Sequence, residues 1–379
     1  MVTKRNVLFD LIRGVSALVV MFSHLRNTMF IDYSELKGTG NISTKIFYFF
    51  TGLGHQAVMI FFVLSGFFVG GAVINKRRIF KFSDYLLSRL TRLWVVLIPA
   101  LIFTLGLDLL VDFLSPDIIE GTYLKILNSG PKESYSLSIK TFIANIFFFQ
   151  TIYTPVYGSN SPLWSLANEF WYYILFPLMF IVLKNKSTYN FYIRVLSFFL
   201  LIGFSIMIYD KLEGYLIWLM GVLVFALYQS NIKIRNKSIS NLIILFSMIL
   251  FLISIVVSKK DYFAGVSLIS NDLFIGVCFS IFIFSIKDSS FFIIENKYLS
   301  KFSIWLSNIS FTLYVIHFPL LMLIFALFYK DNMQVLSLNS FIEFSTISIV
   351  LIVFSYFFWY LFERNTDKVK KYIKQKITK

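Results

Sequence analysis

Three groups that hydrocarbon penalises sit in the first apolar stretch of the chain. "FDLIRGVSALVVMFSHL", residues 9–25, contains Asp10, Arg13 and His24. Arg13 and His24 are 11 residues apart, about three helical turns, so both lie on one face, roughly 16 Å apart along the axis. Asp10 is three residues before Arg13 and can pair with it. An interfacial ion pair and a packed histidine would explain each half alone, but the shared face favours a functional site.

A carboxyl group lies inside a later apolar stretch, "SPLWSLANEFWYYILFPL". Glu169 is surrounded in sequence by aromatic residues, including Trp164, and Ser165 lies four residues before it on the same helical face. A carboxylate at this depth needs a partner. A purely structural, hydrogen-bonded glutamate is the alternative, and we favour a functional or site-orienting role.

The stretch "NISFTLYVIHFPLLML" carries a third polar stripe. Ser310, Tyr314 and His317 follow one another at helical spacing, so they share one face. A structural polar seam explains this stripe as well as a site does. His55, in "TGLGHQAVM", is expected near the outer end of a span, and a direct role is the less favoured interpretation.

The second apolar stretch contains small residues, and arginines follow it before the third stretch. Ser65 and Gly66 in "FFVLSGFFVGG" permit close approach by a backbone or a ligand, although helix packing alone would explain them. Guanidinium groups suit phosphate recognition because of their fixed donor fork, but cytoplasmic anchoring explains most such residues. The arginines concerned are Arg77, Arg78, Arg89 and Arg92, of which the last two are one turn apart.

The elements that carry these residues are membrane helices. Hydrophobic residues make up 58% of the 379 residues, against about 45–50% in soluble domains, and mean hydropathy is +0.76. The surplus falls into runs long enough to cross a bilayer of about 30 Å. The net charge of +15 comes from loops between these runs, as is ordinary for cytoplasmic loops, so nucleic acid is not an expected partner.

The pattern predicts an all-α bundle with about ten crossings and one re-entrant half-helix. Residues 141–152 are too short to cross and precede the turn-rich "TPVYGSNSP". Basic loops then fall on one side, which places both termini in the cytoplasm. The expected apolar segments are 7–30, 46–74, 93–114, 141–152, 163–183, 190–209, 214–229, 241–258, 267–286, 307–329 and 341–362.

We expect an integral-membrane domain over 1–365 and a basic cytoplasmic tail over 366–379. The interrupted first run lacks a cleavage site and is interpreted as an uncleaved span. The single cysteine, Cys278, allows no intramolecular disulfide and no cysteine-based metal site, and a buried packing role is expected for it. No metal is predicted. The phosphate-binding loop G-x-x-x-x-G-K-[ST], the G-x-S-x-G elbow and HExxH are absent from the sequence.

Taken in order, these stretches resemble the acyltransferase-3 family of bacterial membrane O-acyltransferases. The match covers nearly the whole chain: "FDLIRGVSALVVMFSHL" is similar to the Arg-x10-His helix of the family and "FFVLSGFF" to its Ser-Gly motif. "FSDYLLSRLTRL", "PLWSLANEFWYY" and "ISFTLYVIHFPL" resemble its paired-arginine, Trp-Ser-Leu-x-x-Glu and Tyr-x-x-His-x-Pro segments. Two departures are a delayed proline, Pro99, and "FERN" where the family often has Glu-x-Pro.

The resemblance implies transfer of an acyl group, most often acetyl, from cytoplasmic acyl-CoA to a hydroxyl of a cell-envelope glycan or lipid-linked saccharide. His24 would be the general base, with Arg13 and Glu169 in catalytic or orienting roles. Asp10, Trp164, Tyr314 and His317 would bind or orient substrate. The implied contacts of acetyl-CoA are Arg77, Arg78, Arg89, Arg92 and Ser65.

This interpretation also implies a multi-pass protein of the bacterial cytoplasmic membrane, in contact with membrane lipid. A transporter or flippase for a polysaccharide precursor is the alternative, because a polar interior also suits a transport path. A membrane scaffold without catalysis is a weaker alternative that leaves the Arg13 and His24 stripe unexplained. The sequence leaves open the acceptor glycan, the acyl group and whether a covalent acyl-histidine forms.

Overall fold

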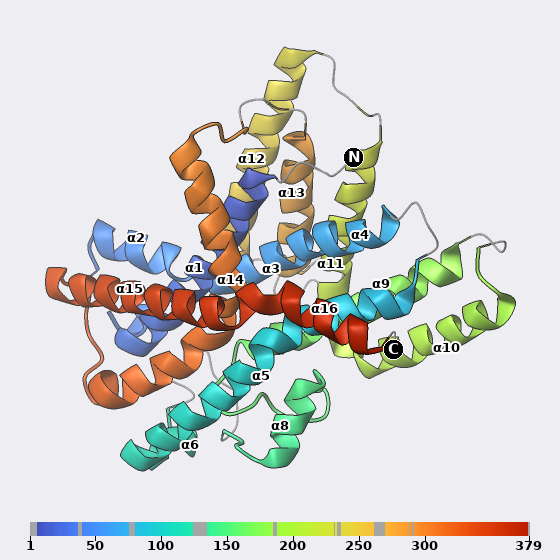
Figure 1. The fold of residues 1–379 in the computed structure, drawn as a ribbon. Coiled ribbons are helices and arrows are strands. Elements are labelled where there is room, and N and C mark those ends of the chain that lie inside the picture. Colours follow the sequence, from blue (N-terminus) through green and yellow to red (C-terminus); the bar gives the residue numbers. More distant parts are fainter. Residues whose placement is uncertain are drawn as a thin grey trace. The chain divides into compact units, whose positions relative to one another are not determined.

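In a computed structural model, the chain forms two compact units. The first unit comprises residues 1–16, 55–82 and 168–305, and the second comprises 17–54, 83–167 and 306–379. Each unit holds several residues of three helices: α1 (Val7–Met29), α9 (Leu163–Leu183) and α14 (Lys297–Ile324). Two more helices, α3 (Gly54–Ser65) and α5 (Phe82–Leu114), have only their first residue in the other unit. Figure 1 labels these helices. The structure describes residues 6–36, 40–75, 80–123, 135–184, 188–230, 232, 236–260, 270–287, 289 and 292–377.

The described residues form helices and contain no β-strand, which confirms the predicted all-α class. Within the described residues, eight helical stretches are long and apolar enough to cross a membrane, and two shorter apolar helices, Phe191–Met207 and Asn271–Ser285, accompany them. The chain is therefore a multi-pass membrane protein. The eight stretches are Val7–Met29, Ile42–Ile74, Phe82–Leu114, Leu163–Leu183, Tyr209–Gln229, Lys237–Lys259, Lys297–Tyr329 and Leu338–Ile377.

In the first unit, α11 (Leu212–Gln229) packs backbone to backbone against α3 (Gly54–Ser65) and the π-helix that follows it, η2 (Gly66–Gly70). A Cβ added at Gly66 would lie 1.8 Å from the Trp218 carbonyl oxygen. One added at Gly221 would lie 1.9 Å from the Val63 carbonyl oxygen. The small residues predicted from "LSGFFVGG" thus serve close helix packing.

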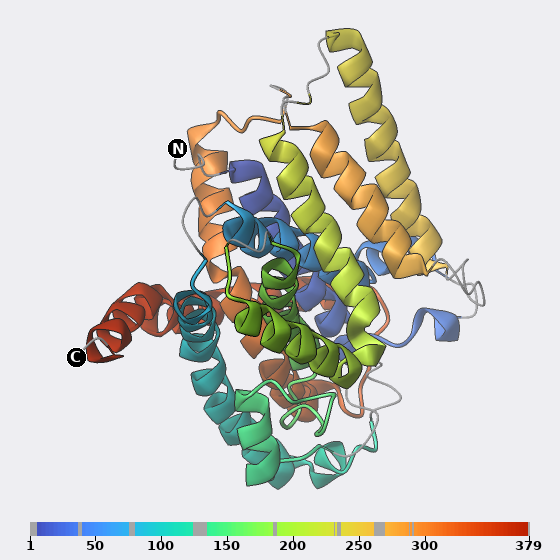
Figure 2. The ribbon, with the colours of Figure 1, turned by 90° about the vertical axis from the view of Figure 1, so that its right-hand side faces the viewer.

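The rest of the first unit packs around this contact. Helix α13 (Asn271–Ser285) lies against both α11 and α12 (Lys237–Lys259), as Figure 2 shows. Cys278 is buried within α13, in agreement with the predicted packing role.

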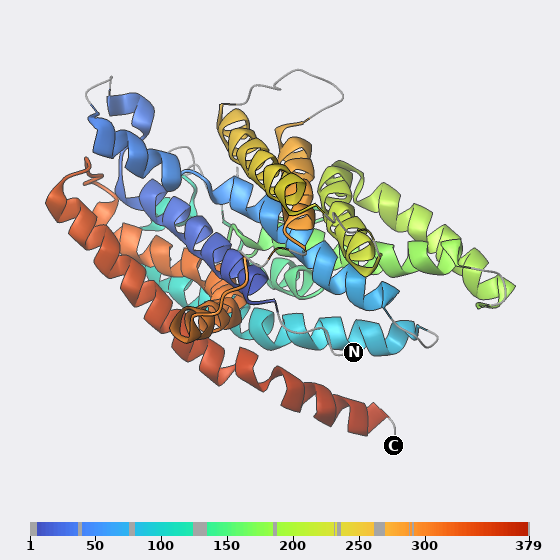
Figure 3. The same ribbon diagram turned by 90° about the horizontal axis from the view of Figure 1, so that it is seen from above.

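Helices α9 and α10, which correspond to the predicted segments 163–183 and 190–209, pack against each other. Helix α10 (Phe191–Met207) turns back along α9 (Leu163–Leu183), as seen in Figure 3. The ring centroids of Trp171 and Phe204 lie 5.3 Å apart, and Arg194 donates to the Val182 carbonyl at 2.8 Å.

The second unit gathers the end of α1 (Val7–Met29) with α5 (Phe82–Leu114), α14 (Lys297–Ile324) and α15 (Leu338–Leu361). Rings join these helices: Phe22 and Phe344 lie 5.6 Å apart between centroids, and Phe103 and Phe354 lie 5.2 Å apart. Shorter helices complete the unit, namely α2 (Ile42–Phe50), α6 (Pro116–Ile119), α8 (Ile139–Ile146) and α16 (Thr366–Ile377).

An irregular segment follows α8, as the turn-rich sequence predicts. Helix α8 has 8 residues, and residues 147–162 form turns and isolated β-bridges before α9 begins. Asp108 of α5 anchors this segment by accepting from the Ser159 backbone at 2.7 Å and from its hydroxyl at 2.6 Å. Gly158 has φ +53°, and a Cβ there would lie 2.0 Å from an Asp108 oxygen, so only glycine fits. Re-entry into the membrane stays a prediction.

The predicted basic tail forms helix α16, which continues beyond α15 after the short turn Glu363–Asn365 (Figure 1). Helix α16 buries no residue of its own. Two of its lysines reach the start of α5: Lys370 donates to the Ser88 hydroxyl at 2.8 Å, and Lys374 lies 3.4 Å from an Asp84 oxygen. The tail is thus attached to the segment that carries the paired arginines.

Candidate active site

Two histidines that are 293 residues apart in sequence form a hydrogen bond in the second unit. His24 of α1 and His317 of α14 place Nδ1 and Nε2, respectively, 2.7 Å apart. Their rings are nearly parallel, with an interplanar angle of 7° and centroids 5.0 Å apart. The ring of Phe318 packs edge-on against His24 at 5.1 Å between centroids. The structure thereby joins two of the sequence-predicted site residues into one centre.

A second hydrogen bond fixes how His317 presents its ring. His317 is fully buried, and its Nδ1 lies 2.8 Å from the Leu313 carbonyl oxygen, one turn earlier in α14. A carbonyl only accepts, so Nδ1 carries the proton and, in a neutral ring, Nε2 is an acceptor. His24 Nδ1 must therefore donate to it, which leaves the lone pair of His24 on Nε2.

Tyr314 extends this centre towards α9. Its hydroxyl lies 2.5 Å from the Ser165 hydroxyl, and its ring centroid lies 6.2 Å from that of His317. Both side chains are buried. Ser310, the third member of the predicted stripe, donates to the Ser307 carbonyl at 2.7 Å, which is a local helix contact. Tyr314 and His317 thus belong to the centre by their contacts, whereas Ser310 fits the structural interpretation.

Asn160 also contacts α14 and was not singled out from the sequence. It is fully buried and donates to the Val315 carbonyl at 2.8 Å and to the Thr104 hydroxyl at 3.1 Å. It precedes α9, in whose first turn the predicted Trp164 lies half-buried. A buried asparagine in a turn-rich loop carries no periodic signal, so the sequence alone could not select it.

The paired arginines lie on α5 in the same unit. Arg89 has its guanidinium carbon 5.8 Å from the Tyr85 ring centroid, and its buried Nε has no hydrogen-bond partner. Arg92 lies 3.6 Å from the buried carboxylate of Glu363, two residues after the end of α15. Such donors with unused hydrogen-bonding capacity fit an anionic ligand such as a phosphate group. Arg77 and Arg78 lie outside the described residues.

The other predicted residues belong to the first unit. Asp10 and Arg13 occupy the first turns of α1, which is one continuous helix as far as His24 and beyond. Asp10 and Arg13 are both half-buried. The roles predicted for them stay predictions.

Ser65 and Glu169 are tied together through one tyrosine. The Ser65 hydroxyl lies 3.1 Å from that of Tyr173 and accepts from the Trp218 indole at 3.1 Å. Tyr173 donates in turn to the Glu169 carboxylate. The hydrogen-bond partner of Glu169 is thus one turn later in α9, and the hydroxyl of Ser165, one turn earlier, bonds Tyr314 instead. This network is compatible with a structural role for Ser65.

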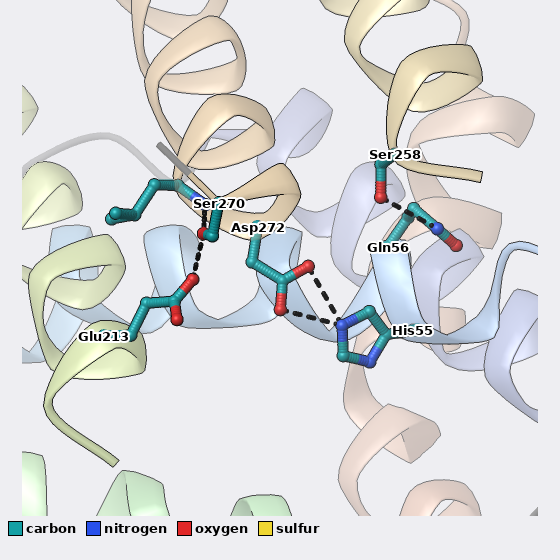
Figure 4. Close-up of polar contacts among 7 residues, drawn as sticks. His55, Gln56, Glu213, Ser258, Ser270 and Asp272 are labelled. Atoms are coloured by element: carbon teal, nitrogen blue, oxygen red, sulfur yellow. Dashed lines mark hydrogen bonds and ion pairs between the residues drawn. The ribbon is translucent and has the colours of Figure 1, made fainter. Parts of the chain in front are cut away.

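His55 takes part in a separate polar cluster of the first unit (Figure 4). Its Nε2 lies 2.8 and 3.0 Å from the two carboxylate oxygens of Asp272, at the start of α13. Glu213 accepts from Ser270, and Gln56 donates to Ser258 at 3.1 Å. The side chain of His55 is 53% exposed, unlike His317. This cluster joins α3, α11, α12 and α13.

No group of three or more histidine, cysteine, aspartate or glutamate side chains that could hold a metal ion occurs in the described part of the chain.

Together the helical membrane fold and the buried histidine centre define a polytopic membrane protein with a candidate proton-transfer site. The profile of the acyltransferase-3 family, described as an acyltransferase domain, matches residues 6–360, so the chain belongs to this family.

Two known proteins are similar to this chain. An O-acetyl transferase of Shigella phage Sf6 is 25% identical over 246 residues, which are 61% of this chain and 66% of the phage protein. An uncharacterized protein of Haemophilus influenzae (strain ATCC 51907 / DSM 11121 / KW20 / Rd) is 30% identical over 156 residues, 38% of this chain and 58% of that protein. The match thus spans less than two thirds of either relative. No solved structure matches the chain.

Proposed function

We propose that the chain is a membrane O-acyltransferase in which His24 is the general base. The acyl group, in the first instance acetyl, comes from acyl-CoA at the cytoplasmic face, and the acceptor is a hydroxyl of a cell-envelope carbohydrate. Membership of the acyltransferase-3 family supports the reaction class, and the phage O-acetyl transferase supports an oxygen acceptor. The membrane is the bacterial cytoplasmic membrane, with both termini in the cytoplasm.

The observation that carries the catalytic proposal is the chain of hydrogen bonds from Leu313 through His317 to His24. With a neutral His317, these hydrogen bonds leave the lone pair of His24 on Nε2, which supports that nitrogen as the proton acceptor. The base is held by a second group, as catalytic histidines are held in hydrolase triads. The partner here is a neutral imidazole rather than a carboxylate.

In the proposed transfer, His24 carries the single proton that moves from the acceptor hydroxyl to the leaving sulfur. His24 Nε2 takes the proton of the acceptor hydroxyl as its oxygen bonds to the thioester carbonyl carbon. The carbon–sulfur bond breaks, and His24 returns the proton to the departing sulfur. The products are an ester and a free thiol.

The paired arginines are the proposed contacts of the donor. When bound, acyl-CoA supplies the activated thioester and several phosphate charges. Arg89 and Arg92 lie one turn apart on α5, and Arg92 approaches Glu363 with one nitrogen, Nη2. Their other N–H groups can donate to phosphate oxygens.

The test is acetyl transfer by membrane vesicles that contain the protein, with labelled acetyl-CoA as donor and isolated envelope glycan as acceptor. We expect His24→Ala to lower transfer by at least about 10²-fold, the scale of general base catalysis, while the protein still accumulates in the membrane. His55→Ala is the matched control, because His55 lies in the polar cluster of Figure 4, and it should keep wild-type transfer.

Normal transfer by His24→Ala would overturn the general-base assignment. Wild-type protein that moves a saccharide across vesicles without acylating it would overturn the enzyme proposal and favour the transporter.

A further inference from the structure

A buried carboxylate connects the paired-arginine helix to the helix that carries His317. Glu363 begins the short turn between α15 and α16 and is 6% exposed. Its Oε2 accepts from the Thr312 hydroxyl of α14 at 2.6 Å. Its Oε1 lies 3.6 Å from Arg92 Nη2 of α5. All three residues belong to the second unit.

The two charges of this pair have different exposure. The side chain of Glu363 is 5% exposed and that of Arg92 is 40% exposed. A carboxylate buried to this extent requires a compensating charge and hydrogen bonds, and Arg92 supplies a positive charge at 3.6 Å. A guanidinium has five N–H donors, and the contact with Glu363 involves one nitrogen. The exposed part of Arg92 can therefore bind an anion while its inner edge is fixed.

The second contact of Glu363 sets where this anion site lies relative to the histidines. Thr312 is five residues before His317 on one continuous helix, a rise of about 7.5 Å. Through Glu363, Arg92 is thus tied to the helix that orients His24. An acyl donor whose phosphate binds Arg92 would have its phosphate end fixed relative to the proton acceptor.

We propose that Glu363 is the positioning residue for the donor phosphate site: it fixes the Arg92 guanidinium to α14, and so relative to the histidine pair. The inference rests on the proposed function, because it presumes a phosphate-bearing acyl donor. Glu363 itself, as an anion, does not contact the phosphate.

The experiment compares Glu363→Gln with wild type in membrane vesicles, with acetyl-CoA concentration varied and with binding of coenzyme A measured on protein in nanodiscs. Glutamine can still accept from Thr312 but no longer attracts Arg92. We expect the donor KM and the coenzyme A Kd to rise about tenfold, with kcat within about threefold. This is the effect of losing one charge-assisted hydrogen bond between Arg92 and the donor phosphate. Glu363→Asp should restore part of the donor affinity.

Asp84→Asn is the matched control. Asp84 also links α5 to the C-terminal segment, by a contact with Lys374, but that pair is solvent-exposed and not made by a guanidinium. Its donor KM should equal that of wild type.

A double-substitution comparison keeps the inference testable if the single variant folds poorly. Arg92→Gln combined with Glu363→Gln removes both charges of the pair, and its donor KM should equal that of Arg92→Gln alone. An unchanged donor KM in Glu363→Gln, or effects of the two substitutions that add, would overturn the positioning role. Lack of acetyl transfer by wild type would instead overturn the proposed function.

Discussion

At the scale of single residues, chemistry depends on the orientation of one imidazole. His24 could be predicted as a site residue from the sequence because a histidine in an apolar run is uncommon. Its spacing from Arg13 also places both residues on one face of the same helix. Which of its nitrogens is the base follows only from His317 and the Leu313 carbonyl. Glu363 escaped selection because it sits at the end of a span, where a charged residue is ordinary.

Substitution of His317 tests this orientation. His317→Ala removes the acceptor of the His24 Nδ1 proton, so we expect kcat for acetyl transfer to fall about 10²-fold with little change in the donor KM. His317→Gln offers an amide oxygen near the former Nε2 and should retain more activity than the alanine variant. Equal kcat for wild type and His317→Ala would contradict an orienting role, provided that both accumulate equally in the membrane.

At the scale of elements, hydropathy predicted the bounds of several helices closely. The predicted segments 163–183 and 214–229 correspond to α9 and α11 within two residues. The start of α5 was not predicted, because the helix begins at Phe82, before its apolar run, with polar first turns that contact α16. The interruption of α3 by the π-helix η2 was likewise not predicted, since π-turns have no periodic signature.

Close packing at the glycines can be tested by stability. Gly66→Ala and Gly221→Ala would place a methyl group within 2 Å of a backbone carbonyl, so we expect each to lower the free energy of unfolding by at least about 2 kcal/mol. Gly203→Ala in α10 is the control, because a Cβ there meets nothing within 4 Å, and it should stabilise by about 0.5–1 kcal/mol. The measurement is the thermal midpoint of the purified protein. A lower midpoint for Gly203→Ala than for Gly66→Ala would contradict this packing.

At the scale of the whole molecule, the basic loops predict the orientation in the membrane. In a Cys278→Ser background, Lys376→Cys on α16 should react with a membrane-impermeant maleimide only in inverted vesicles. Glu120→Cys, after α6, should react in intact cells. Both positions are exposed, so absence of labelling would reflect sidedness. The reverse pattern would contradict a cytoplasmic C-terminus and place the arginines of α5 on the opposite side.

The sequence by itself determined the class of fold, the position of most helices and the face shared by Arg13 and His24. These are local properties: hydropathy and helical period are set by residues within a few turns of each other. Only the tertiary structure decided that His24 meets His317, that Ser165 meets Tyr314 rather than Glu169, and that Glu363 holds Arg92. Those contacts join residues up to 293 positions apart, and which helices become neighbours depends on packing between faces that no single segment specifies.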